Sequence, residues 1–207
     1  MRLRAWDLTI ERGGRRVIAG LSFEAAGGAA LIVTGPNGAG KTSLLRALAG
    51  FLPIEAGGFA LDGGDGERTV GEQAHYLGHA DGVKAALTGG ENLAFAAAML
   101  GGDSSRAAQL GALSALGLSH VIDFPARLLS AGQRRRVALA RLLVAKRPLW
   151  LLDEPTTALD AAAQVALAAI MRAHLKDGGI LVAAVHGDLG LDEAQELRLG
   201  ASERASL

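Results

Sequence analysis

The sequence predicts an α/β protein with a mainly parallel core sheet, an N-terminal antiparallel β subdomain and an inserted α-helical subdomain. Wholly apolar runs at 29–33, 149–152 and 180–185 indicate strands that are buried on both faces, as in parallel sheets. A helical pattern over about 161–175 separates the last two runs. Strands that alternate with helices are typical of parallel α/β folds.

The start of the chain favours a hairpin of exposed antiparallel strands. Apolar and polar residues alternate loosely from Leu3 to Ile10, and Arg12-Gly13-Gly14-Arg15 interrupts the pattern before Val17. A buried strand at 29–33 follows, and then a glycine-rich turn leads into a helix expected over 42–49 and ended by Gly50.

Ala- and Leu-rich helices are expected from Glu91 to Leu116, with an interruption at 101–105. We interpret this part as a helical subdomain, at about 80–127, inserted into a single domain that spans 1–207.

Composition excludes several classes of protein. The 21 Lys and Arg residues balance 21 Asp and Glu residues, and a formal net charge of zero argues against a nucleic-acid binder. The absence of cysteine excludes a disulfide scaffold, a thiolate zinc site and a cysteine nucleophile, and favours the reducing cytosol. No apolar run is long enough to span a membrane, and the first residues lack the apolar region of a signal peptide.

The strongest chemical signal is GPNGAGKT at 35–42, which matches GxxxxGK[ST] between a predicted strand and a predicted helix. Backbone N–H groups of such a loop surround phosphate oxygens, and the helix N-terminus adds partial positive charge. Lys41 would reach the β- and γ-phosphates, and the Thr42 hydroxyl would hold Mg²⁺. The alternative is a glycine-rich turn with an accidental lysine. The predicted ATP-binding residues are Gly35, Pro36, Asn37, Gly38, Ala39, Gly40, Lys41, Thr42 and Ser43.

A second signal is Asp153-Glu154, at the end of an apolar strand. Ligands of open α/β sheets bind at the carboxyl ends of the strands, so both carboxylates are expected near the phosphates. Asp153 would contact Mg²⁺ directly or indirectly, and Glu154 would act as the general base on water. A plain Asp-Glu-Pro turn that ends the strand is the alternative.

The third signal is LSAGQ at 129–133, followed by three arginines at 134–136. Ser130 and Gln133 form a capping-box pattern, which begins a helix. An exposed helix N-terminus with a hydroxyl and a glycine also suits an anion. We interpret the three arginines as a solvated face without a catalytic role.

With these motifs in this order, the chain resembles the ATP-binding subunits of ABC transporters, whose signature motif is LSGGQ. The resemblance implies the ABC ATPase fold of P-loop NTPases over nearly the whole chain, with ATP and Mg²⁺ as cofactors. It also implies that His186 contacts the γ-phosphate beside the catalytic Glu154 and Lys41. From the residues alone, His186 after a buried strand is more often structural.

In that family, two subunits enclose two ATP molecules, so the resemblance implies a homodimer. ATP bound by Lys41 of one subunit would then be capped by the signature of the other. The signature residues are Ser130, Ala131, Gly132 and Gln133. By the same resemblance, TTALD at 156–160 communicates across the dimer, with Asp160 in a coupling role.

Two positions depart from the general family pattern. His79 stands where most members have a glutamine that touches Mg²⁺ and the membrane partner. Mg²⁺ prefers oxygen ligands, so we assign His79 a coupling role and leave it out of the metal set of Thr42 and Asp153. Where many members stack adenine on an aromatic residue, this chain has Arg12, whose guanidinium plane offers a substitute.

Four segments are similar to the CcmA family, the haem-exporter ATP-binding subunits of cytochrome c maturation. They are YLGH at 76–79, KAALTGGENL at 84–93, LSAGQRRRVALARL at 129–142 and GGILVAAVHGDL at 178–189. This resemblance implies an integral membrane partner like CcmB, together with CcmC and CcmD. The chain would lie at the cytoplasmic face of the bacterial inner membrane, held there through its partners only. ATP hydrolysis would serve haem export or release of the haem-loaded chaperone.

Other functions remain open from the sequence. The chain could be the ATP-binding subunit of another small bacterial ABC exporter. A soluble P-loop kinase would leave the LSAGQ motif and His186 unexplained, and a nucleotide-binding module without turnover would leave Glu154 unexplained.

Overall fold

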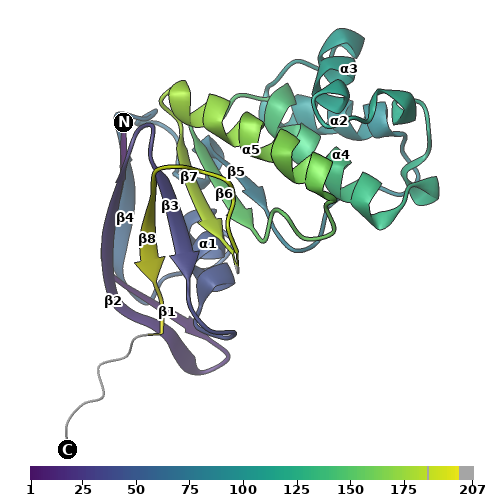
Figure 1. The fold of residues 1–207 in the computed structure, drawn as a ribbon. Coiled ribbons are helices and arrows are strands. Elements are labelled where there is room, and N and C mark those ends of the chain that lie inside the picture. Colours follow the sequence, from purple (N-terminus) through teal and green to yellow (C-terminus); the bar gives the residue numbers. More distant parts are fainter. Residues whose placement is uncertain (186, 201–207) are drawn as a thin grey trace, which may run out of the picture. The chain divides into compact units, whose positions relative to one another are not determined.

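The computed structural model describes residues 1–185 and 187–200, and it confirms the α/β class (Figure 1). These residues form two compact units. The first unit combines residues 1–76 and 148–154 with the chain from His174 onward. The second unit combines residues 77–147 and 155–173.

An antiparallel sheet opens the first unit, with the strand order β2-β1-β4. Its strands are β1 (Arg2–Arg12), β2 (Arg15–Ala26) and β4 (Ala56–Asp62). The predicted hairpin is confirmed as β1 and β2, and the expectation of exposed strands holds for most of β2 but is wrong for one face of β1. Leu3, Leu8 and Ile10 are fully buried because β4 widens the hairpin into a sheet with one face in the core.

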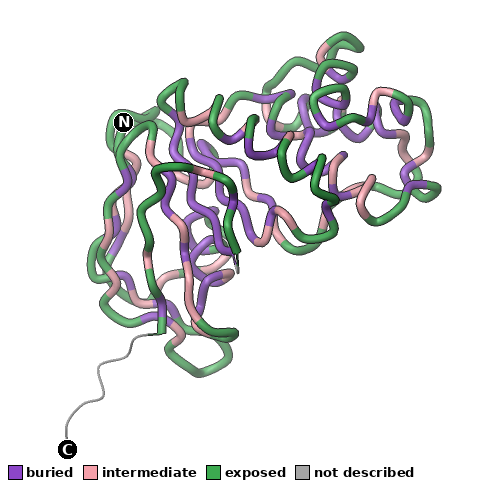
Figure 2. The backbone as a smooth tube through the Cα atoms, in the orientation of Figure 1, coloured by how far each residue is buried: buried purple, intermediate pink, exposed green. Residues whose placement is uncertain are grey.

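The second sheet of this unit has five strands in the order β5-β6-β7-β3-β8, and β6/β7, β7/β3 and β3/β8 pair in parallel. All residues of β6 and β7 are buried, as Figure 2 shows in purple. The predicted parallel sheet is therefore confirmed. Its strands are β3 (Ala30–Thr34), β5 (Ala74–Leu77), β6 (Leu149–Asp153), β7 (Ile180–Ala184) and β8 (Ala194–Arg198), and a 3₁₀ turn at Gly71–Gln73 precedes β5.

Helix α1 (Lys41–Leu48) joins the two sheets of the first unit through the core, with contacts to β1, β6 and β7. Leu44, Leu45 and Leu48 are completely buried in one cluster with residues of both sheets. Their spacing puts them on one face of the helix. This apolar face holds α1, and with it the loop that precedes α1, against the parallel sheet.

The second unit is helical. Its α4 (Ala131–Val144) packs against α2 (Gly89–Leu100) and α3 (Arg106–Ser114), and most of α5 (Ala161–Lys176) also belongs to it. Short 3₁₀ turns lie at Ser119–Val121 and Ala126–Leu128. A capping box at Thr88 begins α2, and Gly101 ends it where the sequence predicts an interruption. Among the described residues, no helix is both long and apolar enough to span a membrane.

Two aromatic rings stack near the amino end of β6 in the first unit. The Trp150 and His174 rings lie 3.9 Å apart between centroids, with an angle of 7° between their planes. His174 Nε2 is 3.2 Å from the Ile180 carbonyl oxygen. Burial lowers the pKa of His174 from 6.5, against smaller opposing effects of the Ile180 carbonyl and the Asp177 carboxylate.

We therefore expect His174 to lower stability in mild acid. The unfolded chain takes up the imidazole proton at a higher pH than the folded chain, so the free energy of unfolding falls as pH drops through the unfolded pKa. Urea unfolding at about pH 8 and about pH 5.5 measures this effect. The wild type should lose more stability than the variant His174→Gln. Equal losses in the two proteins would contradict the prediction.

Candidate functional site

The predicted phosphate loop lies between β3 and α1, where the sequence places it. Gly40 is the N-cap residue of α1, and no side chain caps the helix there. Gly40 has no side chain that could accept from the first N–H groups of α1, and these groups carry the positive end of the helix dipole. A helix end of this kind is suited to an anion such as phosphate.

Gly35 is held in a place that no other residue fits. Its φ is 140°, and a Cβ atom built there would lie 2.5 Å from the Leu199 carbonyl oxygen. Leu199 N also donates to the Thr34 carbonyl at 2.8 Å, so the chain after β8 runs directly beside the start of the loop. The close approach fixes the path of the backbone between β3 and the phosphate loop.

Lys41 is only 8% exposed, and its charge is solvated by the loop itself. Lys41 Nζ donates to the Gly35 carbonyl at 2.6 Å and to the Pro36 carbonyl at 3.2 Å. An ammonium group this buried needs such acceptors, and a phosphate oxygen would be a stronger one because it is charged. The geometry thus places a desolvated cation directly at the helix end.

Asp153 lies at the same sheet edge as the phosphate loop. Val33 of β3 pairs with Ala184 of β7, and Ala184 pairs with Asp153 of β6. Two strand spacings, about 10 Å, therefore separate Asp153 from the strand that delivers the loop. Asp153 is 4% exposed. The pKa of Tyr76 is raised mainly by burial of the phenol and, second, by the negative charge of Asp153.

Glu154 ends β6 with an unusual backbone. Its φ is 48°, in the left-handed region, and its N–H donates to the Ala184 carbonyl at 2.9 Å. A residue with a Cβ pays on the order of 1–2 kcal/mol for this conformation. Backbone strain of this kind is found at functional sites.

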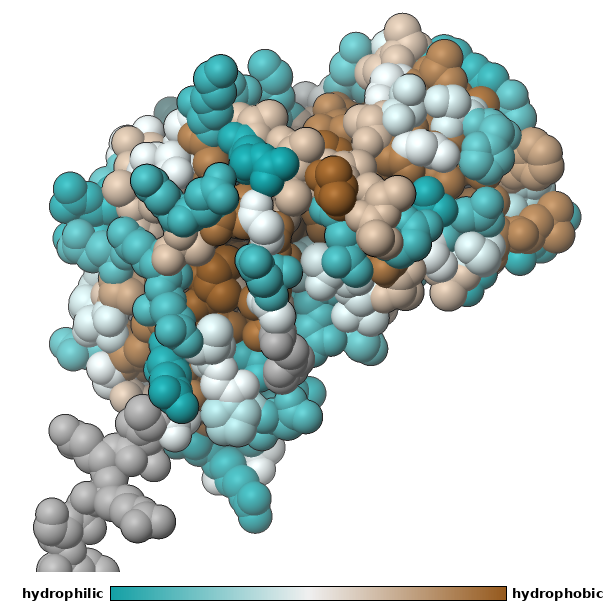
Figure 3. Space-filling view, in the orientation of Figure 1, coloured by the Kyte–Doolittle hydropathy of each residue, from teal (hydrophilic) through white to brown (hydrophobic). Residues whose placement is uncertain are grey.

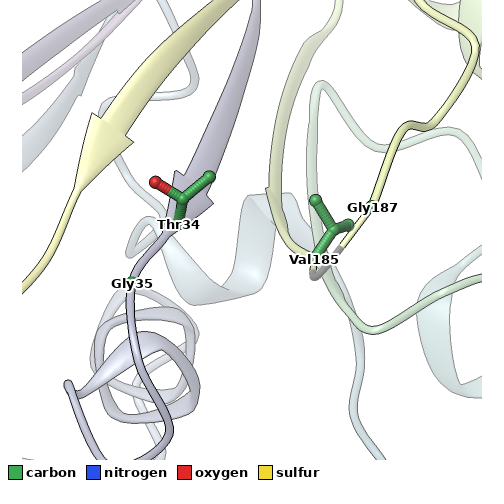
Figure 4. A pocket seen from close by; sticks show the side chains of 4 residues that line it. All are labelled: Thr34, Gly35, Val185 and Gly187. Atoms are coloured by element: carbon green, nitrogen blue, oxygen red, sulfur yellow. The ribbon is translucent and has the colours of Figure 1, made fainter.

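A pocket of about 350 Å³ opens at the carboxyl ends of β3 and β7. Figure 4 shows Thr34 and Val185 at the ends of these strands, with Gly35 and Gly187 completing the lining. The position between Val185 and Gly187 is His186, which lies outside the described residues. Its contact with the γ-phosphate stays a prediction.

The LSAGQ segment belongs to the second unit, where it begins α4. Ser130 Oγ accepts from the Gln133 N–H at 3.2 Å, and Gln133 Oε1 accepts from the Ser130 N–H at 2.9 Å. The capping box is thereby confirmed, with Ser130 and Ala131 exposed at the helix end.

Gly132 packs tightly against the loop that contains Asp160. A Cβ atom at Gly132 would lie 2.9 Å from the carbonyl oxygen of Ala158, whose own φ is 63°. Asp160 Oδ1 accepts from the Ala163 N–H at 2.8 Å and so caps α5. The structure therefore brings two predicted site segments of the second unit, 130–133 and 156–160, into contact.

His79 is exposed, as suits a residue that meets a partner. The prediction that the three arginines at 134–136 form a solvated face is wrong for Arg135, which is only 3% exposed. Its face of α4 is otherwise apolar, with Ala138, Leu139 and Leu142 at the next positions of the same side. That spacing is the signal in the sequence that could have identified Arg135 as buried.

The comparisons with known proteins agree with these motifs. The family model described as ABC transporter matches residues 18–157. The cytochrome c biogenesis ATP-binding export protein CcmA of Nitrobacter winogradskyi is 58% identical over 200 residues, which cover 97% of this chain and 98% of that protein. The protein of the same name from Bradyrhizobium diazoefficiens is 54% identical over 200 residues, with the same coverage.

Solved structures have the same fold. An ATP-binding protein described as a putative ABC transporter from Pyrococcus furiosus superimposes with a TM-score of 0.84 at 22% identity, over 96% of this chain and 98% of that one. A bacterial Atm1-family ABC exporter with ATP bound gives a TM-score of 0.82 at 26% identity, over 96% of this chain and 37% of the exporter.

We expect Gly35→Ala to weaken nucleotide binding by at least about tenfold more than Gly38→Ala. Both positions have positive φ, but only a Cβ at Gly35 collides with a carbonyl, whereas nothing lies within 4 Å of one at Gly38. Titration of each variant with ATP measures the affinities. Equal affinity in the two variants would show that the approach to Leu199 does not shape the loop.

Proposed function

This chain belongs to the ABC transporter family, within it to the CcmA group of cytochrome c biogenesis ATP-binding export proteins, and we propose that its ATP hydrolysis powers a membrane complex of that pathway. The observation that carries the proposal is the buried Lys41 at the N-terminus of α1, with Asp153 at the same edge of the sheet as the loop that precedes α1. The work of the complex would be haem export or release of the haem-loaded chaperone.

In this proposal, the first unit performs the chemistry. Residues Gly35 to Ser43 surround the phosphates of ATP, and Lys41 exchanges its loop carbonyls for phosphate oxygens. The Thr42 hydroxyl and the Asp153 carboxylate are the oxygen donors that Mg²⁺ prefers, so these residues fit that ion. Mg²⁺ would supply neutralisation of phosphate charge. Glu154 would accept the proton of the attacking water, with His186 beside the γ-phosphate.

The second unit supplies contacts to other chains. Ser130, Ala131, Gly132 and Gln133 would cap the ATP held by the other subunit of a homodimer, so one subunit alone has an incomplete site. The exposed helix end at Ser130 supports this role, because its N–H groups and hydroxyl suit a γ-phosphate. Asp160 and the loop that contacts Gly132 would communicate between the two ATP sites of the dimer.

The membrane partners would be a CcmB-like subunit with CcmC and CcmD. Apolar residues on the surface of the second unit support a protein partner there, and Figure 3 shows such surface in brown. In the second unit, Phe95, Met99 and Leu128 are 47%, 70% and 68% exposed. His79 would couple this partner to the nucleotide. We further propose a single ATP-binding domain over 1–207 with its helical subdomain at about 80–127, located at the cytoplasmic face of the inner membrane through these partners.

Replacement of the general base tests the proposed function. Glu154→Gln should bind ATP but hydrolyse it about 10²–10⁴-fold more slowly, because the amide cannot accept the proton of water. With ATP and Mg²⁺, it should be trapped as a dimer and co-purify with the CcmB-like subunit. Hydrolysis assays, size measurement and identification of bound membrane proteins give the three readouts.

Glu193→Gln is the matched control, since Glu193 is an exposed carboxylate of the same unit. It should leave hydrolysis unchanged. Two results together would instead favour a kinase. The Glu154→Gln variant would be strictly monomeric and bind no membrane partner, and the wild-type protein would turn over ATP only with a small acceptor.

The helix-capping role of Ser130 can be distinguished from its proposed role in the ATP-dependent dimer. Ser130 caps α4 and Ser105 caps α3, each by accepting an N–H at 3.2 Å, so alanine at either should cost about 1 kcal/mol of stability. Only Ser130→Ala should also weaken the ATP-dependent dimer. Urea unfolding and dimerisation assays provide the comparison, and equal dimerisation of the two variants would assign Ser130 a capping role alone.

A further inference from the structure

The buried guanidinium of Arg135 holds the segment that contains His79. Arg135 Nη1 donates to the Gly78 carbonyl at 2.9 Å and forms an ion pair with Asp81 Oδ1 at 3.2 Å. The side chain of Arg135 is 4% exposed, and that of Asp81 is 27% exposed. The cation is therefore largely removed from water, where both its hydrogen bonds and its charge pairing are strong.

A second arginine of α4 reinforces this contact. Arg141 Nη1 lies 3.2 Å from the Asp81 carbonyl and 3.4 Å from the Gly82 carbonyl. Burial lowers the pKa of Arg141, and the Asp81 carboxylate opposes this effect. The backbone of residues 78–82 is thus bound to α4 on both sides of His79, while His79 and Ala80 between the anchors are exposed.

The helix that provides both guanidiniums is the one that begins at Ser130. Arg135 lies five positions after Ser130, little more than one helical turn along α4. A helix of this length is rigid relative to a loop, so a displacement of its first turn moves Arg135 as well. The segment with the exposed His79 is thus bound to the same helix that begins at the exposed signature.

We propose that Arg135 is a positioning residue that couples the signature helix to the His79 segment, so that movement imposed at either one is transmitted to the other. The inference rests on the proposed coupling role of His79 and extends it to a specific physical connection. The ligand of the segment is the membrane partner, and the ligand of the helix end is ATP. Arg135 is buried between the helix and the segment, where it contacts Gly78 and Asp81.

The chain contains no cysteine, which allows a clean test. Ala80→Cys introduces a single, exposed site for a nitroxide label, and the label reports the mobility of the His79 segment by electron paramagnetic resonance. We expect Arg135→Gln to shorten the rotational correlation time at least about twofold, because the anchors at Gly78 and Asp81 are lost. Arg135→Lys, which keeps the charge but not the fork of donors, should give an intermediate value.

Arg136→Gln is the matched control. Arg136 is adjacent on α4, but its Nη1 donates to the Leu116 carbonyl at 3.3 Å and not to the His79 segment. It should leave the label unchanged. Label mobility equal to the wild type in Arg135→Gln would overturn the proposal, and so would an equal increase in Arg136→Gln. If Arg135→Gln fails to fold, Arg135→Lys and Asp81→Asn carry the same comparison.

The assembled complex with its membrane subunits provides the functional readout. Arg135→Gln should reduce stimulation of ATP hydrolysis by the partner at least about tenfold, with the KM for ATP within about twofold of the wild type. Full stimulation with a mobile label would overturn the coupling role of Arg135. Full stimulation in His79→Ala would instead overturn the proposed role of His79, while the label experiment would still decide whether Arg135 holds the segment.

Discussion

The parallel register of β3, β7 and β6 is the constraint on which the rest of the structure depends. Val33, Ala184 and Asp153 lie in one row across these strands, so the phosphate loop and the carboxylates emerge at the same edge. The register is held by strands that are buried on both faces and by α1, whose apolar side packs against them. A one-residue slip of β6 would exchange the faces of its side chains and separate Asp153 from the loop.

Much of this arrangement was predictable, because its signals are local. The glycine spacing of the phosphate loop and the apolar runs of β3, β6 and β7 can be recognised without knowing which segments pack against them. The strands β4, β5 and β8 were missed, because AGGFALD, AHYL and AQELR become strands only through pairing with a strand that is already in place. Arg135 was misassigned for a related reason. A run of arginines usually indicates an exposed surface, and only the helical spacing of α4 shows that Arg135 lies on its apolar face.

The candidate chemistry is divided between two units that the chain enters more than once. Lys41, Asp153 and Glu154 belong to the first unit, whereas the signature and His79 belong to the second. Glu154 is the last residue of its segment in the first unit, and Pro155 begins the next segment of the second. The strained backbone of Glu154 thus lies at a covalent junction between the part that would cleave ATP and the part that would meet other chains.

The contact between Gly132 and Ala158 also limits which residues the signature can carry. The family motif has two adjacent glycines, and this chain has alanine at the first of them, Ala131, whose methyl group is exposed. The second, Gly132, faces a carbonyl oxygen that leaves no space for a methyl group. The glycine is therefore required from within the subunit, by the fit between the first turn of α4 and the loop at Ala158, and not only by the nucleotide that the motif would meet.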